Sequence, residues 1–312
     1  MENLIIIGSG PAALTAAIYA GRSQLSPLLI TGTALGGQAA TTAEVENYPG
    51  FPQGIGGMEL MAQMQKQAER FGARLEMDEV VAVNLRQHPF AVKASSAPYE
   101  SKAVVIATGV SPRQLGVPGE DKFNGRGVSY CATCDGFFYR DKTVVVVGGG
   151  DAAVEEAIFL TRFASKVYLV HRRNELRAAK IAQERALQNP RIEFVWNSII
   201  TEVLGEDHVT GVRTKILSNG EEAILPADGV FTYIGNVPKT QLFAGQLELD
   251  EQGYIVTDRS MHTSVPGVFA AGDVQERVLK QVATAVGTGA IAAMEAERFI
   301  ATMEGRAYPE RP

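Results

Sequence analysis

The hydrophobic positions of this chain form short continuous runs that end in glycine. The first run, Leu4–Ile7, leads into Gly8, and a stretch rich in helix-forming residues, Leu14–Ala20, follows. An uninterrupted apolar run predicts a strand that is buried on both faces, as strands of a parallel sheet are. The order of strand, glycine turn and helix is typical of a unit that binds the pyrophosphate of a dinucleotide.

The same order recurs in the middle of the chain. Thr143–Val147 predicts a second buried strand, and a helical stretch, Val154–Leu160, follows the next glycines. Two complete units predict two nucleotide sites in two domains, and 312 residues exceed the size at which a single core usually divides. Glycines allow the tight turn and the close approach of phosphate, and the helix N-terminus supplies positive potential. The predicted phosphate-binding residues are Gly8, Gly10, Pro11 and Ala12 in the first unit, and Gly148, Gly150, Asp151 and Ala152 in the second.

The second unit also indicates its nucleotide. Its next predicted strand, Lys166–Val170, ends in His171, Arg172 and Arg173, and Arg177 follows one turn later. At this position, about 20 residues past the glycines, an NAD site carries an acid for the ribose 2′-hydroxyl, whereas guanidinium groups suit a 2′-phosphate. The alternative is a solvated run of charge at the end of a strand. We therefore expect NADPH in the second unit.

The remaining pattern completes an α/β fold with two Rossmann-like dinucleotide-binding domains, each in three layers (ββα). Two proline-containing segments, Pro112–Pro118 and Asn236–Lys239, are candidate hinges. They place an inserted domain, which carries the expected NADPH site, at residues 114–245, within a first domain made of residues 1–113 and 246–312; the resemblance described below implies FAD for this first domain. Further expected elements are a helix at Met58–Phe71, an antiparallel hairpin at Phe90–Tyr99, buried strands at Ala103–Gly109, Gly229–Gly235 and Gly267–Asp273, and a long helix at Gln281–Met303.

The two cysteines of the chain lie close together, in Cys131-Ala132-Thr133-Cys134, and Asp135 follows them. Two thiols at this spacing can form a disulfide that exchanges with an outside disulfide. The carboxyl group of Asp135 could carry the proton that a thiolate leaving group needs. A zinc site is disfavoured because four ligands are required and no second cysteine pair exists. Inert buried thiols remain the other alternative.

Composition narrows the class of protein further. The net charge of −6 argues against nucleic acid as the partner of the whole surface. No apolar run approaches the roughly 20 residues of a membrane span, and Leu4–Ile7 has no basic segment before it, unlike a signal peptide. Two cysteines are too few for a secreted disulfide scaffold, so we expect the cytoplasm.

Six segments together resemble the bacterial low-molecular-weight thioredoxin reductases, which are pyridine nucleotide-disulfide oxidoreductases. The resemblance extends along essentially the whole chain, and a CxxC inside the pyridine-nucleotide domain is its most specific feature. The segments are Gly8-Ser9-Gly10-Pro11-Ala12, Glu44-Val45-Glu46-Asn47-Tyr48-Pro49-Gly50, Ala107-Thr108-Gly109, Cys131-Ala132-Thr133-Cys134-Asp135-Gly136, His171-Arg172-Arg173 and Ala270-Ala271-Gly272-Asp273.

The resemblance implies FAD in the first unit and a route from NADPH through flavin and dithiol to thioredoxin. It implies that Cys134 is the sulfur next to the flavin, that Cys131 attacks thioredoxin, and that Asp135 transfers the proton. Asp273 would contact the ribityl chain of the flavin. The other flavin-site residues implied are Gly37, Gln38, Glu46, Asn47, Thr108, Gly109, Gly272 and Gln281.

The family resemblance also implies a homodimer in which one domain swivels on the other. Phe137 and Phe138, with Arg126, would then form an exposed docking site for thioredoxin, although most phenylalanines are core residues. The chain departs from the family at Lys280-Gln281-Val282, where Arg-Gln-Ala is common, and at Gly235-Asn236-Val237-Pro238-Lys239, where Gly-His-x-Pro-Asn is common.

Two other readings remain open. One is a reductase of the same architecture with another electron donor, such as ferredoxin, or with an acceptor other than thioredoxin. Arg172, Arg173 and Arg177 argue against an electron donor other than NADPH. The other is a nucleotide-sensing protein without catalysis, and the dithiol argues against it because sensing needs no thiols.

Overall fold

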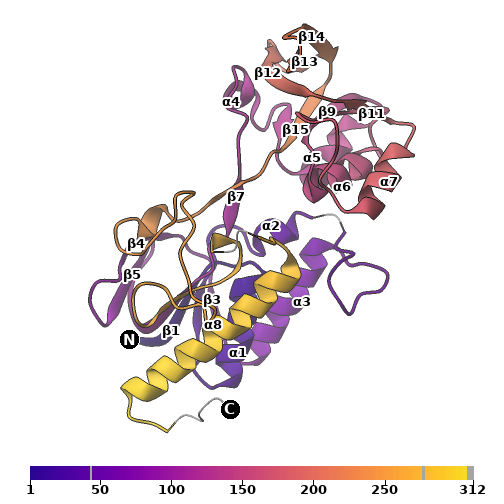
Figure 1. The fold of residues 1–312 in the computed structure, drawn as a ribbon. Coiled ribbons are helices and arrows are strands. Elements are labelled where there is room, and N and C mark those ends of the chain that lie inside the picture. Colours follow the sequence, from indigo (N-terminus) through magenta and orange to yellow (C-terminus); the bar gives the residue numbers. More distant parts are fainter. Residues whose placement is uncertain (43, 276–277, 308–312) are drawn as a thin grey trace. The chain divides into compact units, whose positions relative to one another are not determined.

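The chain crosses twice between two compact units. The computed structural model describes residues 1–42, 44–275 and 278–307 (Figure 1). Unit 1 comprises Met1–Ser111 and Val237–Pro312, and unit 2 comprises Pro112–Asn236. Unit 2 is therefore an insertion in unit 1. Within the described residues, no helix is both long enough and apolar enough to cross a membrane.

Unit 1 is built on a seven-stranded sheet in which β6 has two different neighbours on one side. The first half of β6 pairs antiparallel with β5, and its second half pairs parallel with β17. On its other side β6 pairs parallel with β1, and both were predicted as buried strands. The strands are β1 (Glu2–Ile7), β2 (Leu28–Ile30), β3 (Arg74–Glu76), β4 (Val80–Asn84), β5 (Phe90–Ala94), β6 (Pro98–Ile106) and β17 (Val268–Ala270), in the order β3-β2-β1-β6-β5-β4 with β17 also on β6.

Helices cover one face of this sheet, and small residues allow them to pack closely. Gly289 of α8 meets α1 so tightly that a Cβ there would lie 2.3 Å from the carbonyl oxygen of Ala12. On the opposite face, side chains of β1 and β6 pack against side chains of β4 and β5 of the same sheet and against the segment that contains Phe243. The helices are α1 (Pro11–Arg22), α2 (Gly37–Ala40), α3 (Gly57–Arg70) and α8 (Val282–Met303), with 3₁₀ turns η2 (Gln241–Phe243) and η3 (Gly272–Val274).

Unit 2 has the three layers that the sequence predicted. A parallel sheet in the order β11-β10-β9-β15-β8 lies between helices and a three-stranded antiparallel sheet, β12-β13-β14. The strands are β8 (Val128–Ser129), β9 (Thr143–Gly148), β10 (Lys166–Val170), β11 (Ile192–Val195), β12 (Ser198–Gly205), β13 (Val209–Ile216), β14 (Glu222–Pro226) and β15 (Gly229–Tyr233). The helices are α4 (Glu120–Phe123), α5 (Ala132–Asp135), α6 (Asp151–Leu160) and α7 (Lys180–Leu187), with the 3₁₀ turn η1 (Gly136–Tyr139).

Where the chain crosses between units, β7 (Val110–Pro112) and β16 (Asn236–Pro238) form a two-stranded ribbon. The sequence placed the return to the first domain at residue 246, but the chain rejoins unit 1 at Val237. The reason is Phe243, whose side chain is fully buried in the core of unit 1. At the other crossing, residues 112 and 113 belong to unit 2.

Candidate active site

The functional groups of unit 2 gather at the carboxyl edge of its parallel sheet. In the register of the sheet, Val147 pairs with both Val170 and Thr232, and Ser129 pairs with Phe231. The segments that follow β8, β9 and β10 therefore leave the sheet at one edge, where α/β sheets bind their ligands. These segments hold the dithiol, the glycine turn and the arginines.

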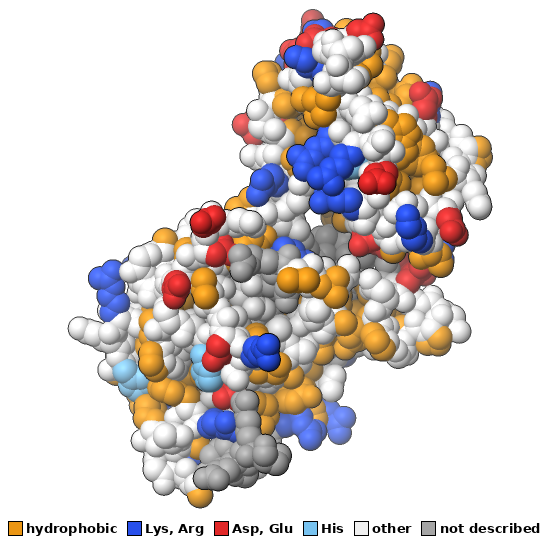
Figure 2. Space-filling view, in the orientation of Figure 1, with side chains coloured by type: hydrophobic (Ala, Val, Ile, Leu, Met, Phe, Trp, Pro, Cys, Tyr) orange, Lys and Arg blue, Asp and Glu red, His pale blue; other side chains and the backbone are white. Residues whose placement is uncertain are grey.

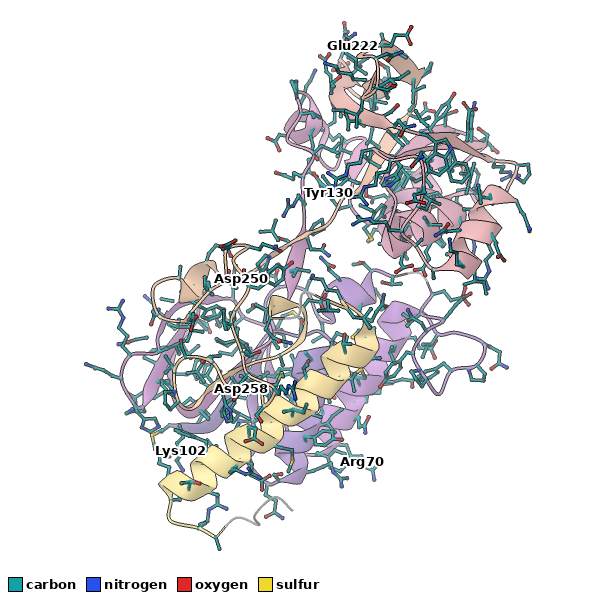
Figure 3. All side chains as sticks on the ribbon, in the orientation of Figure 1. Arg70, Lys102, Tyr130, Glu222, Asp250 and Asp258 are labelled. Carbon is teal, nitrogen blue, oxygen red and sulfur yellow. A yellow bond between two sulfur atoms is a disulfide. The ribbon has the colours of Figure 1, made fainter. Side chains whose placement is uncertain are left out.

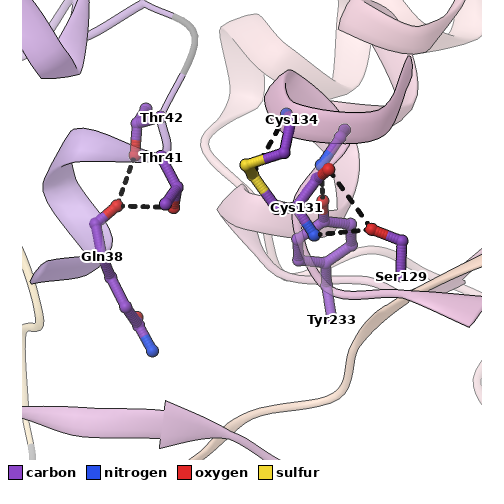
Figure 4. The surroundings of a disulfide bond; sticks show 8 residues. Gln38, Thr41, Thr42, Ser129, Cys131, Cys134 and Tyr233 are labelled. Carbon is purple, nitrogen blue, oxygen red and sulfur yellow. Dashed lines mark hydrogen bonds between the residues drawn. A yellow bond between two sulfur atoms is a disulfide. The ribbon is translucent and has the colours of Figure 1, made fainter. Parts of the chain in front are cut away.

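The two cysteines form a disulfide at the start of α5 (Figure 4). Their Cα atoms are 5.3 Å apart, and the backbone N–H of Cys134 donates to Sγ of Cys131 at 3.1 Å. Upstream, the N–H of Cys131 donates to Oγ of Ser129 at 3.0 Å. Cys134 is exposed and Cys131 is half-buried. The pair is thus held by backbone contacts on both sides while its sulfurs stay near the surface.

Tyr233, at the end of β15, anchors the same helix. The N–H of Ala132 donates to the phenol oxygen of Tyr233 at 2.9 Å (Figure 4). Burial raises the pKa of Tyr233, and the charges of Glu156 and Asp135 add to the shift. Burial, with the charge of Asp135, also raises the pKa of Tyr139 to about 12. Both phenols stay protonated at neutral pH, and Asp135 lies close enough for its charge to raise the pKa of both.

The glycine turn after β9 leads directly into α6, whose N-cap, Gly150, makes no side-chain capping bond. The first-turn N–H groups of this helix are therefore not satisfied by a capping side chain, which suits a phosphate. The neighbouring side chain, Asp151, is engaged within the protein, because its Oδ1 accepts the N–H of Ala179 at 2.6 Å. Ala152 is exposed beside it.

His171 differs from the arginines that follow it. The residue is 4% exposed, and its ring lies under the glycine turn, so that a Cβ on Gly149 would come within 2.4 Å of it. Burial lowers the pKa of His171, and the positive charges of Arg177, Arg173 and Arg172 act in the same direction. The imidazole is thus a neutral support for the turn.

The three arginines themselves, Arg172, Arg173 and Arg177, are exposed. Their charges all act on His171, which places them around the end of β10. None of them forms an ion pair with a residue in the described part of the chain. Figure 2 shows Lys and Arg side chains gathered on the surface of unit 2. Guanidinium groups without an ion-pair partner beside a glycine turn are suited to a phosphate group.

Unit 1 repeats this arrangement at the carboxyl edge of its own sheet. Ile7, Ile106 and Ala270 lie in one row across β1, β6 and β17, so the segments that follow leave at the same edge. Gly8 has a φ of +131°, and a Cβ there would lie 2.2 Å from the oxygen of Ala107. The predicted unit 1 residues that this edge gathers are Gly8, Gly10, Pro11, Ala12, Thr108, Gly109, Gly272 and Asp273.

A second group of predicted residues lies beside this edge. Gly37 approaches Gly10, since a Cβ on Gly37 would lie 3.5 Å from the Cα of Gly10. The side-chain amide of Asn47 donates to Oε1 of Gln281 at 2.9 Å, and Gln281 caps α8. Four of the predicted polar side chains thus have protein partners: Gln38 donates to the oxygen of Val110, Thr108 donates to the oxygen of Lys239, and Asn47 bonds to Gln281.

Comparison with known proteins decides the family. A family model described as pyridine nucleotide-disulphide oxidoreductase matches residues 2–289. The chain belongs to this family. It is 52% identical to a thioredoxin reductase of Mycolicibacterium smegmatis over 97% of this chain and 98% of that protein. It is 50% identical to a thioredoxin reductase of Streptomyces coelicolor over 100% of this chain and 98% of that protein. Among solved structures, a Lactococcus lactis thioredoxin reductase has a TM-score of 0.95 at 40% identity, over 97% and 100%.

In this oxidoreductase, two aromatic rings follow the dithiol on the surface. Phe137 is 61% exposed and Phe138 is 68% exposed, so neither is a core residue. Phe137 packs edge-on against Phe163 at 6.2 Å, and the guanidinium of Arg140 lies over it at 5.3 Å. Arg126 is also exposed, and its guanidinium donates to the carbonyl oxygen of Lys122.

Two residues near the disulfide carry no clear signal in the sequence. Tyr233 ends a strand that the sequence predicted, but its bond to Ala132 depends on the pairing of β15 with the two-residue strand β8. Glu156 lies in a predicted helix, and only its unusual burial distinguishes it. An acid on the apolar face of a predicted helix was the signal available for Glu156.

Proposed function

We propose that this chain is an NADPH-dependent flavoenzyme that reduces the disulfide of thioredoxin through Cys131 and Cys134. The observation that carries the proposal is the disulfide at the carboxyl edge of the same sheet that holds the glycine turn and the arginines. The relatives named thioredoxin reductase support the choice of acceptor. We place the protein in the cytoplasm because its two cysteines suit a reducing compartment.

The residues of both edges fit the two cofactors. In unit 1 the uncapped N-terminus of α1 and the glycines at positions 10 and 37 leave room for the pyrophosphate of FAD, and Gly8 allows the tight turn against Ala107. Asp273 would contact the ribityl chain, with Glu46 and Asn47 beside the ring system. In unit 2, Gly148 and Gly150 would hold the pyrophosphate of NADPH, and Arg172, Arg173 and Arg177 its 2′-phosphate. When bound, FAD would supply the electron transfer between nicotinamide and disulfide.

The side chains of unit 2 then divide the exchange with thioredoxin. Cys131 attacks one sulfur of the thioredoxin disulfide, and Cys134 displaces the thioredoxin by closing the bond with Cys131. Asp135 gives a proton to the departing thiolate. The N–H of Cys134, which contacts Sγ of Cys131, favours a thiolate on Cys131.

Substitution of each cysteine tests this assignment. With FAD bound, Cys131→Ser and Cys134→Ser should both lose NADPH-dependent reduction of thioredoxin, and both should keep a flavin that NADPH bleaches. Cys131→Ser should show a long-wavelength absorbance from the thiolate of Cys134 next to the flavin, and Cys134→Ser should lack it. Reversed spectra would exchange the two roles. Full thioredoxin reduction by either variant would refute the proposal.

We propose further that thioredoxin docks on Phe137, Phe138 and Arg126. Exposed aromatic rings and arginines are typical of protein-binding hot spots, and truncation of one costs about 2 kcal/mol or more. The substitutions Phe138→Ala and Arg126→Ala together should thus raise the KM for thioredoxin about 30-fold. Reduction of the small disulfide reagent DTNB should stay within about twofold of wild type. Equal losses with both acceptors would contradict the docking site.

A homodimer is also part of the proposal. On unit 1, Tyr19, Ile291 and Met294 are each more than a third exposed and line one groove of about 410 Å³. Exposed apolar side chains that share a groove are suited to a second copy of the chain. Light scattering of the purified protein should give twice the mass of the chain, and Ile291→Glu should lower it.

A further inference from the structure

Near the dithiol helix lies a half-buried glutamate, with one carboxyl oxygen fully buried, that the exchange described above does not use. Glu156 is on α6, on the same face as Ala153 and Leu160. Both of these neighbours belong to the apolar cluster that contains Ala132 of α5. The Oε2 atom of Glu156 is buried and accepts no hydrogen bond from any residue that the structure describes. A charge at this oxygen is costly because nothing replaces its lost hydration.

The charge of Glu156 acts on Tyr233, the residue that holds the start of α5. Burial raises the pKa of Glu156 to about 7, and the charge of Glu155 adds to the shift. The charge of Glu156 in turn raises the pKa of Tyr233, whose oxygen holds the N–H of Ala132. From α5, Asp135 also acts on Tyr233. In the described chain, α7, β9 and β10, which pack near α6, contribute no charge to this group.

We propose that Glu156 is a positioning residue that sets the proton balance of the dithiol. Above about pH 7 its carboxyl is uncharged while a thiolate is present at the start of α5, and it ionises when the disulfide closes. It acts through its charge and through Tyr233. The inference deepens the proposed function, on which it relies for NADPH as the source of electrons.

Reduction of the disulfide adds two electrons, breaks the Sγ–Sγ bond, and leaves one sulfur as a thiol and the other as a thiolate, so the sulfurs take up one proton. A thiolate and a nearby carboxylate repel each other, which raises the pKa of Glu156 further. Above about pH 7, where the carboxyl is ionised beside the disulfide, a second proton passes from solvent to Glu156. Both protons leave when the disulfide forms again.

The test is the thiol–disulfide equilibrium of the full-length, FAD-bound protein with dithiothreitol at pH 6 and pH 8.5, read by alkylation and mass spectrometry. At pH 6, Glu156→Gln should match wild type within about 1.5-fold, because glutamine resembles the uncharged carboxyl. At pH 8.5 the reduced fraction should rise, with an equilibrium constant at least about threefold higher than wild type. Glu184→Gln, an exposed site on α7, should match wild type at both values.

The proposal would be overturned if the equilibrium constant of Glu156→Gln, divided by that of wild type, were the same at the two pH values, since a merely structural role would not depend on pH. If Glu156→Gln does not fold, Glu155→Gln keeps the buried carboxyl and removes the charge beside it. The inflection in the pH profile should then move to lower pH, and an unmoved inflection would equally refute the proposal. This equilibrium needs neither NADPH nor thioredoxin. A wild-type protein that failed to reduce thioredoxin would therefore refute the proposed function and leave this measurement unaffected.

Discussion

Glu120 should be the most costly carboxylate to replace in unit 2. Its side chain is 1% exposed and accepts three hydrogen bonds. Oε1 accepts the N–H of Leu115 at 2.8 Å and the hydroxyl of Tyr130 at 2.9 Å, and Oε2 accepts the N–H of Gly116 at 2.7 Å. Burial, the bond to Glu120 and its charge raise the pKa of Tyr130, which is labelled in Figure 3. The carboxylate thus joins the 112–118 segment to the residue that precedes Cys131.

The expected costs follow from these bonds. In Glu120→Gln the amide oxygen can keep the two bonds of Oε1, but the amide NH₂ then faces the N–H of Gly116. A lost charge-assisted bond and an unsatisfied buried donor together cost about 3 kcal/mol. Tyr130→Phe removes one bond to a charged acceptor from a half-buried phenol, which costs about 1.5 kcal/mol. The double variant should cost at least about 1 kcal/mol less than the sum, because both changes remove the same bond.

Urea unfolding followed by the fluorescence of Trp196 measures these costs. Trp196 is the single tryptophan of the chain and lies in unit 2, so its emission reports on that unit. Glu184→Gln, an exposed site in the same unit, should change the free energy of unfolding by less than about 0.5 kcal/mol. A cost below about 1 kcal/mol for Glu120→Gln, or strictly additive single variants, would refute the reasoning.

Three further predictions concern unit 2. Replacing Arg172 and Arg173 with glutamine should lower the ratio of kcat/KM for NADPH to that for NADH at least about tenfold, and an unchanged ratio would exclude these residues from the phosphate site. The pKa of Glu156 is about 7 in the folded protein and 4.5 for an ordinary glutamate, so the wild-type free energy of unfolding falls as the pH rises between these values. Glu156→Gln should remove this loss, which is up to about 3 kcal/mol between pH 4 and pH 8. Parallel profiles of unfolding free energy against pH for the two proteins would contradict this. Gly149→Ala should destabilise unit 2 by about 2 kcal/mol, because the added Cβ meets the His171 ring. Gly150→Ala has open space around the added Cβ and should cost less than about 1 kcal/mol. Equal costs of the two substitutions would contradict the packing of His171 under Gly149.

The parallel strands were predictable because burial on both faces requires an unbroken apolar run. Leu4–Ile7 and Thr143–Val147 have such runs, and both are central strands flanked on each side. The glycine turns were predictable for the same reason, since each directly follows one of these strands. Gln281, the predicted start of the last long helix, is the N-cap of α8.

Contacts between segments distant in sequence could not be predicted in this way. His171 reads as one basic residue among several, and only the tertiary structure shows that its ring lies under Gly149. The return of the chain to unit 1 at Val237 depends on the burial of Phe243 in the core of that unit, which no local pattern indicates. Glu156 illustrates the same limit, because a helical pattern gives the face of a side chain but not the hydrogen bonds available there.

The position of the dithiol constrains how electrons can reach it. The dithiol follows β8 and the glycine turn follows β9, and β15 lies between these two strands. Neighbouring strands are about 4.8 Å apart, so the two segments start about 10 Å apart along the sheet, and the pairing of the strands fixes this separation. If, as proposed above, both groups react with a flavin bound to unit 1, this fixed separation favours a movement of unit 2 as one body over the rearrangement of one loop. The β7–β16 ribbon carries both crossings of the chain and would then be the place of that movement.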